Sequence, residues 1–315
     1  MQAYIIRRLL QVIPVLLFVT IMSYSLILLT GDPVQARLGP GEAYDAEQIE
    51  YLRHKWGLDK PIPVQYAIWL GNAVRGDFGR STITNRPVID EIGERLLVTL
   101  QLGIAAWLFS VIIAIPAGVI SAVRRGSKLD LLATIITIGG VATPGFWLGI
   151  LLILLFGVTL RWLPTYGFVS LFDDPIQGLR HLILPAISLG ITTAAINMRQ
   201  MRSSMLEVLA QDYIRTARAK GLKERNVIWI HALKNSFLPV LTLMGLQIGR
   251  LFGGAIVIET LFAIPGMGRL MVTSIFNRDF PIVQACVLLI ALAVVLANLA
   301  TDLLYAYLDP RIKYS

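Results

Sequence analysis

Long apolar runs dominate this sequence and limit what it can fold into. Each has about the 20 residues that an α-helix needs to cross the hydrocarbon core of a bilayer. Only 15% of the 315 residues are charged and 56% are hydrophobic, whereas a soluble domain carries about 25% charged residues. The runs cover 9–30, 97–121, 129–159, 181–199, 238–260 and 284–307. We therefore expect an all-α polytopic membrane protein, a single membrane domain over 1–315 without a soluble domain.

The first and third runs differ from simple spans. The run 9–30 is too long for a signal-peptide core, and Gly31–Asp32–Pro33 after it is not a small-residue cleavage site, so we expect a retained span followed by a turn. The run 129–159 exceeds one span, and Gly139–Gly140 and Pro144–Gly145 interrupt it. It predicts a broken or strongly kinked helix, either one kinked span or an interfacial helix followed by a span.

The distribution of basic residues sets the orientation. The net charge of +8 would suggest nucleic-acid binding in a soluble protein, but in a membrane protein the positive-inside rule explains it, and no nucleic-acid partner is expected. With the N-terminus inside, the short outer loops hold only Arg161, Arg180, Arg269 and Arg278. The inner segments hold Arg7, Arg8, Arg124, Arg125, Lys128, Arg199, Arg202, Arg215, Arg218, Lys220, Lys223, Arg225, Lys234, Arg311 and Lys313. Six transmembrane helices with cytoplasmic N- and C-termini satisfy the rule.

Two polar segments separate these spans. The outer segment 31–96 has helical spacing of apolar residues and several aromatics, which predicts short helices near 43–56, 64–74 and 87–95 in an extracytoplasmic cap. The inner segment 200–237 predicts two helices, 204–220 and 224–237, separated by Gly221 in a left-handed conformation. Leu206, Leu209, Tyr213 and Ala217 fall on one stripe of the first helix. An ordinary basic loop would be shorter, so we expect the inner segment to be a docking segment for a cytoplasmic partner.

The residues of this inner segment carry a family resemblance. Tyr213–Ile–Arg–Thr–Ala–Arg–Ala–Lys–Gly221, followed by His231–Ala–Leu–Lys–Asn235 and Leu238–Pro239, resembles the coupling loop of ABC importer permeases. Arg215 and Thr216 replace the Glu and first Ala of the general importer motif, which is the form of the peptide/nickel branch. Further similar segments are Gly31–Asp32–Pro33, Gly57–Leu–Asp59, Pro63–Val–Gln65, Gly76–Asp77–Phe–Gly79, Pro265–Gly–Met–Gly268, Asn277–Arg–Asp–Phe–Pro281 and Leu308–Asp–Pro–Arg311.

The resemblance implies a type I ABC importer permease fold and a place in a larger complex. It implies a second homologous permease subunit, two cytoplasmic ATPase subunits and an extracytoplasmic substrate-binding protein. The chain would form half of a pathway for di- or oligopeptides, with nickel chelates, glutathione and oligosaccharides as alternatives. The sequence has no Gly-x-x-x-x-Gly-Lys-Ser/Thr segment, so ATP and Mg²⁺ are expected on the partner ATPases and no cofactor on this chain. ATPase coupling is assigned to Tyr213, Arg215, Thr216, Ala217, Arg218, Lys220, Gly221, Leu222 and Lys223.

The run 238–260 carries polar residues and a glycine repeat. Arg250 lies about 18 Å along a helix from Leu238, near mid-bilayer, where a charge costs at least about 2.5 kcal/mol. It either pairs structurally, with Glu259 or a group of the second subunit, or lines the pathway. Gln247 is a further candidate for pairing or the pathway. Helix packing is expected at Gly245, Gly249 and Gly253.

The sequence disfavours two other functional classes. A secondary transporter calls for intramembrane carboxylates or histidines at mid-span, of which there are few. It also does not explain the long helical segment 200–237. A membrane-embedded enzyme calls for a motif such as His-Glu-x-x-His or Gly-x-Ser-x-Gly, and the chain has neither. The three histidines show no ligand spacing and Cys286 is the single cysteine, so we expect neither a metal site nor catalysis.

Overall fold

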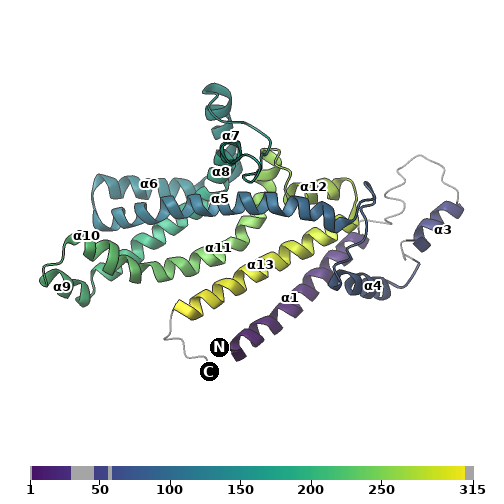
Figure 1. Cartoon of the computed structure of the whole chain (residues 1–315), viewed down its shortest axis with the longest axis horizontal. Coiled ribbons are helices and arrows are strands. Elements are labelled where there is room, and N and C mark those ends of the chain that lie inside the picture. Colours follow the sequence, from purple (N-terminus) through teal and green to yellow (C-terminus); the bar gives the residue numbers. More distant parts are fainter. Residues whose placement is uncertain (1, 30–45, 56–58, 309–315) are drawn as a thin grey trace. The chain divides into compact units, whose positions relative to one another are not determined.

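The computed structural model describes residues 2–29, 46–55 and 59–308. Within these ranges the chain is helical, with one isolated bridge between Arg80 and Pro87 and no strand (Figure 1). The predicted features at Asp32–Pro33, Gly57 and 309–311 lie outside the described residues. The chain forms two compact units, residues 1–98 with 265–295 and residues 99–264 with 296–315.

The first unit contains the first predicted span, the described part of the predicted outer segment and the loop after the fifth span. Its helices are α1 (Gln2–Leu29), α3 (Ala46–Lys55), α4 (Ile62–Val74), the start of α5 (Val88–Val123), α12 (Met267–Phe276) and the start of α13 (Phe280–Leu308). The short helices predicted at 43–56 and 64–74 are confirmed as α3 and α4, and the one predicted at 87–95 is the first part of α5. The core of the unit is made by Ala73, Phe78, Val88, Ile92, Met267, Ile282, Ala285 and Cys286.

In this first unit, the residues that follow one family-like segment, Gly76–Gly79, contact another, Asn277–Pro281. Gly76 and Gly79 have φ values of +84° and +79°, which glycine adopts without a Cβ penalty. Asp77 accepts a hydrogen bond from the amide of Gly79 at 2.9 Å. The buried carboxylate of Asp279 accepts hydrogen bonds from the hydroxyl of Ser81 at 2.5 Å and from the amide of Thr82 at 3.0 Å. These contacts fasten the loop before α5 to the start of α13.

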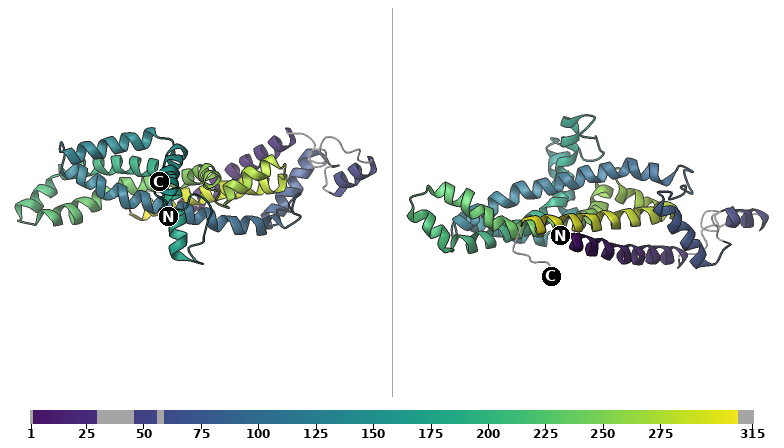
Figure 2. Two further views of the ribbon diagram at one scale, coloured as in Figure 1. Left: turned by 90° about the horizontal axis from the view of Figure 1, so that it is seen from above. Right: turned by 60° about the horizontal axis from the view of Figure 1, so that its bottom comes forward.

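The second unit is built around the long helix α8. Its helices are α5 from residue 99, α6 (Lys128–Ala142), α7 (Gly145–Leu152), η1 (Ile153–Thr159), α8 (Pro175–Leu209), α9 (Asp212–Ala219), α10 (Glu224–Asn226), η2 (Val227–Ala232), α11 (Leu233–Leu261) and the end of α13. Asp174 caps α8 by accepting from the amides of Ile176 and Gln177, both at 3.0 Å. α8 packs against α6, α7 and α11. In Figures 1 and 2, α9 and α10 lie together at one end of this unit.

The run 129–159 is a broken helix, as predicted. α6 and the α7–η1 segment meet at an angle of 106°. The break falls at Thr143, which is extended with φ −88° and ψ 122° and precedes Pro144. A residue before proline is pushed out of the α region by the proline ring, and Pro144 then opens α7.

Several helices have the length and composition of membrane spans. Among the described residues, α5, α8, the 224–249 helix and α13 qualify, and the bent pair from α6 to η1 makes a fifth if it forms one span. The segments 10–25, 251–261 and 267–276 are shorter apolar helices. An all-helical fold with several spans is therefore confirmed, whereas six spans with cytoplasmic termini stay a prediction.

Candidate functional site

The inner segment contains one more break than the sequence predicts. The helix expected over 204–220 is wrong as one element, because α8 continues to Leu209, the chain turns at Ala210–Gln211 and α9 begins at Asp212. Gln211 is extended with ψ 150°. The second helix, expected over 224–237, is likewise not separate, because α10 and η2 run on into α11. The turn at Ala210–Gln211 redirects α9 so that one of its faces folds back onto the neighbouring helices.

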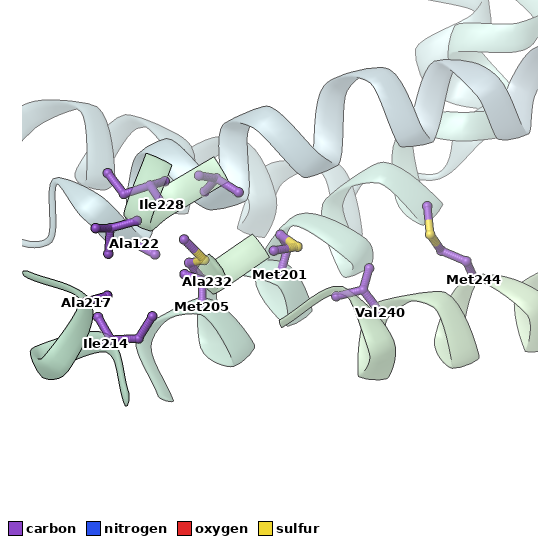
Figure 3. Packing of buried hydrophobic residues seen from close by; sticks show 11 residues of the cluster. Ala122, Met201, Met205, Ile214, Ala217, Ile228, Ala232, Val240 and Met244 are labelled. Atoms are coloured by element: carbon purple, nitrogen blue, oxygen red, sulfur yellow. The ribbon is translucent and has the colours of Figure 1, made fainter. Parts of the chain in front are cut away.

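The buried face of α9 consists of Ile214 and Ala217. Ile214 is fully buried and Ala217 is 9% exposed. Figure 3 shows both in one cluster with Met201 and Met205 of α8 and with side chains of α5, η2 and α11. The other members of the cluster are Val119, Ala122, Val227, Ile228, Ala232, Val240 and Met244. The predicted stripe is therefore wrong at one position: Tyr213 is 42% exposed and Ile214 takes its place.

The opposite face of α9 and the following turn are exposed. Of the nine predicted coupling residues, only Ala217 is buried. The exposed ones are Tyr213, Arg215, Thr216, Arg218, Lys220, Gly221, Leu222 and Lys223. Arg215 forms an exposed ion pair with Asp212 at 3.3 Å, one turn earlier, which stabilises the helix only slightly. The structure thus presents a short cationic helix with an apolar underside held by the core.

Three contacts define the shape of this exposed segment. Gly221 ends the helix with φ +78°, as predicted, and its amide donates to the carbonyl of Arg218 at 2.9 Å. Arg218 donates two hydrogen bonds to Glu224, at 2.7 and 3.2 Å, which join the two sides of the Gly221 turn and raise the pKa of its guanidinium. Asn235 of α11 donates to the hydroxyl of Tyr213 at 2.8 Å. The segment is therefore tied to α10 and α11 as well as to the core.

A polar network that the sequence did not predict braces the helices beside this segment. The buried carboxylate of Asp130 accepts from Arg202 at 2.7 and 3.0 Å, from Ser121 at 2.5 Å and from the amide of Gly126 at 2.9 Å. It joins the turn between α5 and α6 to α8, which leads into α9. The sequence signal was an acid two residues after Lys128 in a basic turn, but nothing local identifies a partner 72 positions away.

The polar residues of α11 have different surroundings. Glu259 is fully buried and accepts from the hydroxyl of Thr99 on α5 at 2.6 Å. Gln247 is 2% exposed, and neither its amide nitrogen nor its amide oxygen has a hydrogen-bond partner among the described residues. The side chain of Arg250 lies outside the described residues, so its pairing stays a prediction.

The three predicted packing glycines also differ from one another. A Cβ on Gly245 would overlap the side chain of Thr301 at the end of α13. A Cβ on Gly253 would have nothing within 4 Å, whereas one on the adjacent Gly254 would lie 2.9 Å from Leu189 of α8. Close helix contact on α11 therefore occurs at Gly245 and Gly254. Packing at Gly249 stays a prediction.

No metal-binding cluster accompanies these sites: the described residues contain no group of three or more His, Cys, Asp or Glu side chains placed to hold an ion. The described part of the chain is thus organised as spanning helices with an exposed helical loop.

Comparisons with known proteins agree with this organisation. The family of binding-protein-dependent transport system inner membrane components matches residues 114–314, and the N-terminal model of the same family matches residues 1–103. The chain is 45% identical over 312 residues to the glutathione transport system permease protein GsiC of Escherichia coli K12, covering 99% of each chain. It is 43% identical to the dipeptide transport system permease protein DppB of Alkalihalophilus pseudofirmus, covering all of both chains.

A solved structure gives the same answer for the fold. The inward-facing MetNI methionine ABC transporter aligns with a TM-score of 0.55 at 16% identity, covering 70% of this chain and 96% of the other. At that identity the likeness concerns the fold alone. The two family models and the two relatives establish that this chain is a multi-pass bacterial inner-membrane protein that belongs to the peptide/nickel family of ABC importer permeases.

Proposed function

We propose that this chain is one of two permease subunits of an ATP-driven importer and forms half of the translocation pathway for di- or oligopeptides. A second homologous permease completes the pathway, two cytoplasmic ATPase subunits supply the energy, and an extracytoplasmic binding protein delivers the substrate. The chain crosses the bilayer six times as a single permease domain, with both termini and the segment 200–237 in the cytoplasm and the segment 31–96 outside.

The anchoring of α9 is the observation that carries this proposal. A helix of eight residues is too short to be stable by itself in water. Here Ile214 and Ala217 hold it against α5, α8, η2 and α11 while eight of the predicted coupling residues remain exposed. A force applied to the exposed face is therefore transmitted to three long helices at once. An ATPase groove that receives α9 would use this connection to open and close the pathway.

The exposed charges indicate how the ATPase is recognised. Arg215, Arg218, Lys220 and Lys223 are all exposed, so we expect an acidic or carbonyl-rich groove on the ATPase. The neighbouring Tyr213 and Leu222, 42% and 40% exposed, supply apolar contact area. This combination of apolar centre and cationic rim is typical of a reversible protein interface.

A charge reversal on α9 tests the coupling proposal. In the complex co-expressed with its ATPases, partner permease and binding protein, Arg215→Glu should lower binding-protein-stimulated ATP hydrolysis and transport together. The matched control is Arg225→Glu, which makes the same change at an exposed position of α10. Equal rates for the two variants would refute the assignment of α9 as the coupling helix.

The substrate class has two candidates supported by relatives. The dipeptide permease and the glutathione permease are similarly close to this chain, at 43% and 45% identity. Both names describe peptide-like cargo, and we propose peptides with ordinary α-peptide bonds as the main substrate. Proteoliposomes supplied with the cognate binding protein should accumulate di- and tripeptides faster than glutathione or a nickel chelate. Faster uptake of glutathione than of di- and tripeptides would refute ordinary peptides as the main substrate and favour glutathione.

A further inference from the structure

A cavity of about 300 Å³ lies within the second unit, among α7, α8 and α11. Its walls combine apolar side chains with the hydroxyl-bearing residues Ser188, Thr192 and Thr193 of α8, and with Gln247 of α11. This volume is at the lower end of the range for small-molecule sites. Because the chain forms half of a pathway, the cavity can form one side of a peptide site that the second permease completes.

Gln247 is the unusual member of this cavity. Its side chain is 2% exposed, and both polar atoms of its amide lack a hydrogen-bond partner among the described residues. Buried polar groups are almost always hydrogen-bonded, because losing water without a replacement is unfavourable. By contrast, Ser188 donates to the carbonyl of Leu184 at 2.7 Å and Thr192 donates to that of Gly140 at 3.3 Å. Gln247, whose amide has an unsatisfied donor and an unsatisfied acceptor, therefore lines a cavity in which the hydroxyl groups of Ser188 and Thr192 are already engaged.

The helix break forms one side of the same cavity. Gly145 and Phe146, the first residues of α7, line it. Pro144 precedes them, and no side chain caps α7, so its first amide groups have no intrahelical acceptor. Interrupted backbone at membrane depth is tolerated where it is buried in protein or lines a water-filled cavity. Both the break and the free amide thus mark this cavity as a polar place within the spanning helices.

A carboxamide has the same donor and acceptor groups as a peptide bond. It can accept from a main-chain N–H and donate to a main-chain carbonyl, whatever side chains the peptide carries. Leu251, Val257 and Ile258 provide apolar wall beside it, which tolerates varied side chains. From this geometry we propose that Gln247 hydrogen-bonds the main chain of the transported peptide as it passes the cavity. The inference rests on the proposed function, since it concerns the cargo of the same importer.

The first test uses the full complex in proteoliposomes with trialanine as the cargo. Gln247→Leu should lower the initial rate of trialanine uptake about tenfold, the equivalent of one hydrogen bond, and leave binding-protein-stimulated ATP hydrolysis within about twofold of wild type. Gln284→Leu is the matched control, because it removes another buried glutamine amide, 8% exposed, on α13. A Gln247→Leu complex that transports trialanine at the wild-type rate would overturn the inference.

A second measurement distinguishes contact with the peptide from a structural role. The wild-type complex should transport trialanine faster than an analogue that is N-methylated on its main chain and that the binding protein still binds. Gln247→Leu should reduce the ratio of the trialanine uptake rate to the uptake rate of the N-methylated analogue. A loss of both rates by the same factor, or failure of Gln247→Leu alone to assemble with the second permease, would assign the amide to structure and overturn the inference. A wild-type complex that moves neither peptide while hydrolysing ATP would instead overturn the proposed peptide function.

Discussion

Replacing Ile214 by alanine should release α9 from the membrane helices without unfolding them. Ile214 is fully buried, and an Ile→Ala change at such a site costs about 2–5 kcal/mol. A central cost of about 3 kcal/mol lowers the docking equilibrium constant of α9 about a hundredfold. The only other buried side chain of α9 is the methyl group of Ala217. Nine of the eleven buried residues of the hydrophobic cluster lie on other helices, so we expect the loss to fall mainly on α9.

The assay compares two identical changes in the reconstituted complex. Ile214→Ala should abolish most stimulation of the ATPases by the binding protein, and residues 212–223 should exchange amide hydrogens faster. Ile230→Ala is the matched control, because Ile230 is 58% exposed on η2 and the same methyl groups are removed. If Ile214→Ala leaves both exchange and stimulation at the level of Ile230→Ala, the argument that packing of Ile214 transmits the ATPase motion is wrong.

Three other substitutions test contacts within the second unit. Gly221→Ala should cost about 1 kcal/mol because the φ of +78° is strained for alanine although nothing crowds a Cβ there, and a thermal shift of the complex measures it. Asp130→Asn should leave Arg202 without its carboxylate and lower stability by on the order of 3 kcal/mol, visible as earlier thermal aggregation; an unchanged midpoint would contradict this. Gly245→Ala should lower the yield of folded protein because its Cβ overlaps Thr301. Adding Thr301→Gly to Gly245→Ala should restore that yield.

These predictions separate two kinds of interaction in the proposed coupling site. The cluster around Ile214 is apolar and buried, so it contributes stability and stiffness. The pair between Arg218 and Glu224 is 43% and 55% exposed, so it contributes little to stability and mainly sets the shape of the Gly221 turn. Effects of Arg218 substitutions on ATP hydrolysis would therefore report on contact with the ATPase more than on loss of fold.

Local features of the sequence were sufficient for the helical class, the broken third run and the turn at Gly221. A bilayer-length apolar run, a residue before proline and a glycine after a helix each restrict the backbone within a few positions. The proposed coupling segment rests on the same kind of local information, because its motif is contiguous between Tyr213 and Gly221, and its coupling role stays a prediction.

Other properties depend on residues that are far apart in the chain, and only the tertiary structure decided them. Helical periodicity placed Tyr213 on the buried stripe, but the turn at Ala210–Gln211 put Ile214 there instead. Asp130 finds Arg202 because the α5–α6 turn meets α8. Whether Gln247 is paired or free depends on which side chains α7 and α8 bring to it. Spacing along one helix is local information, whereas the partner of a buried polar group is set by packing between helices.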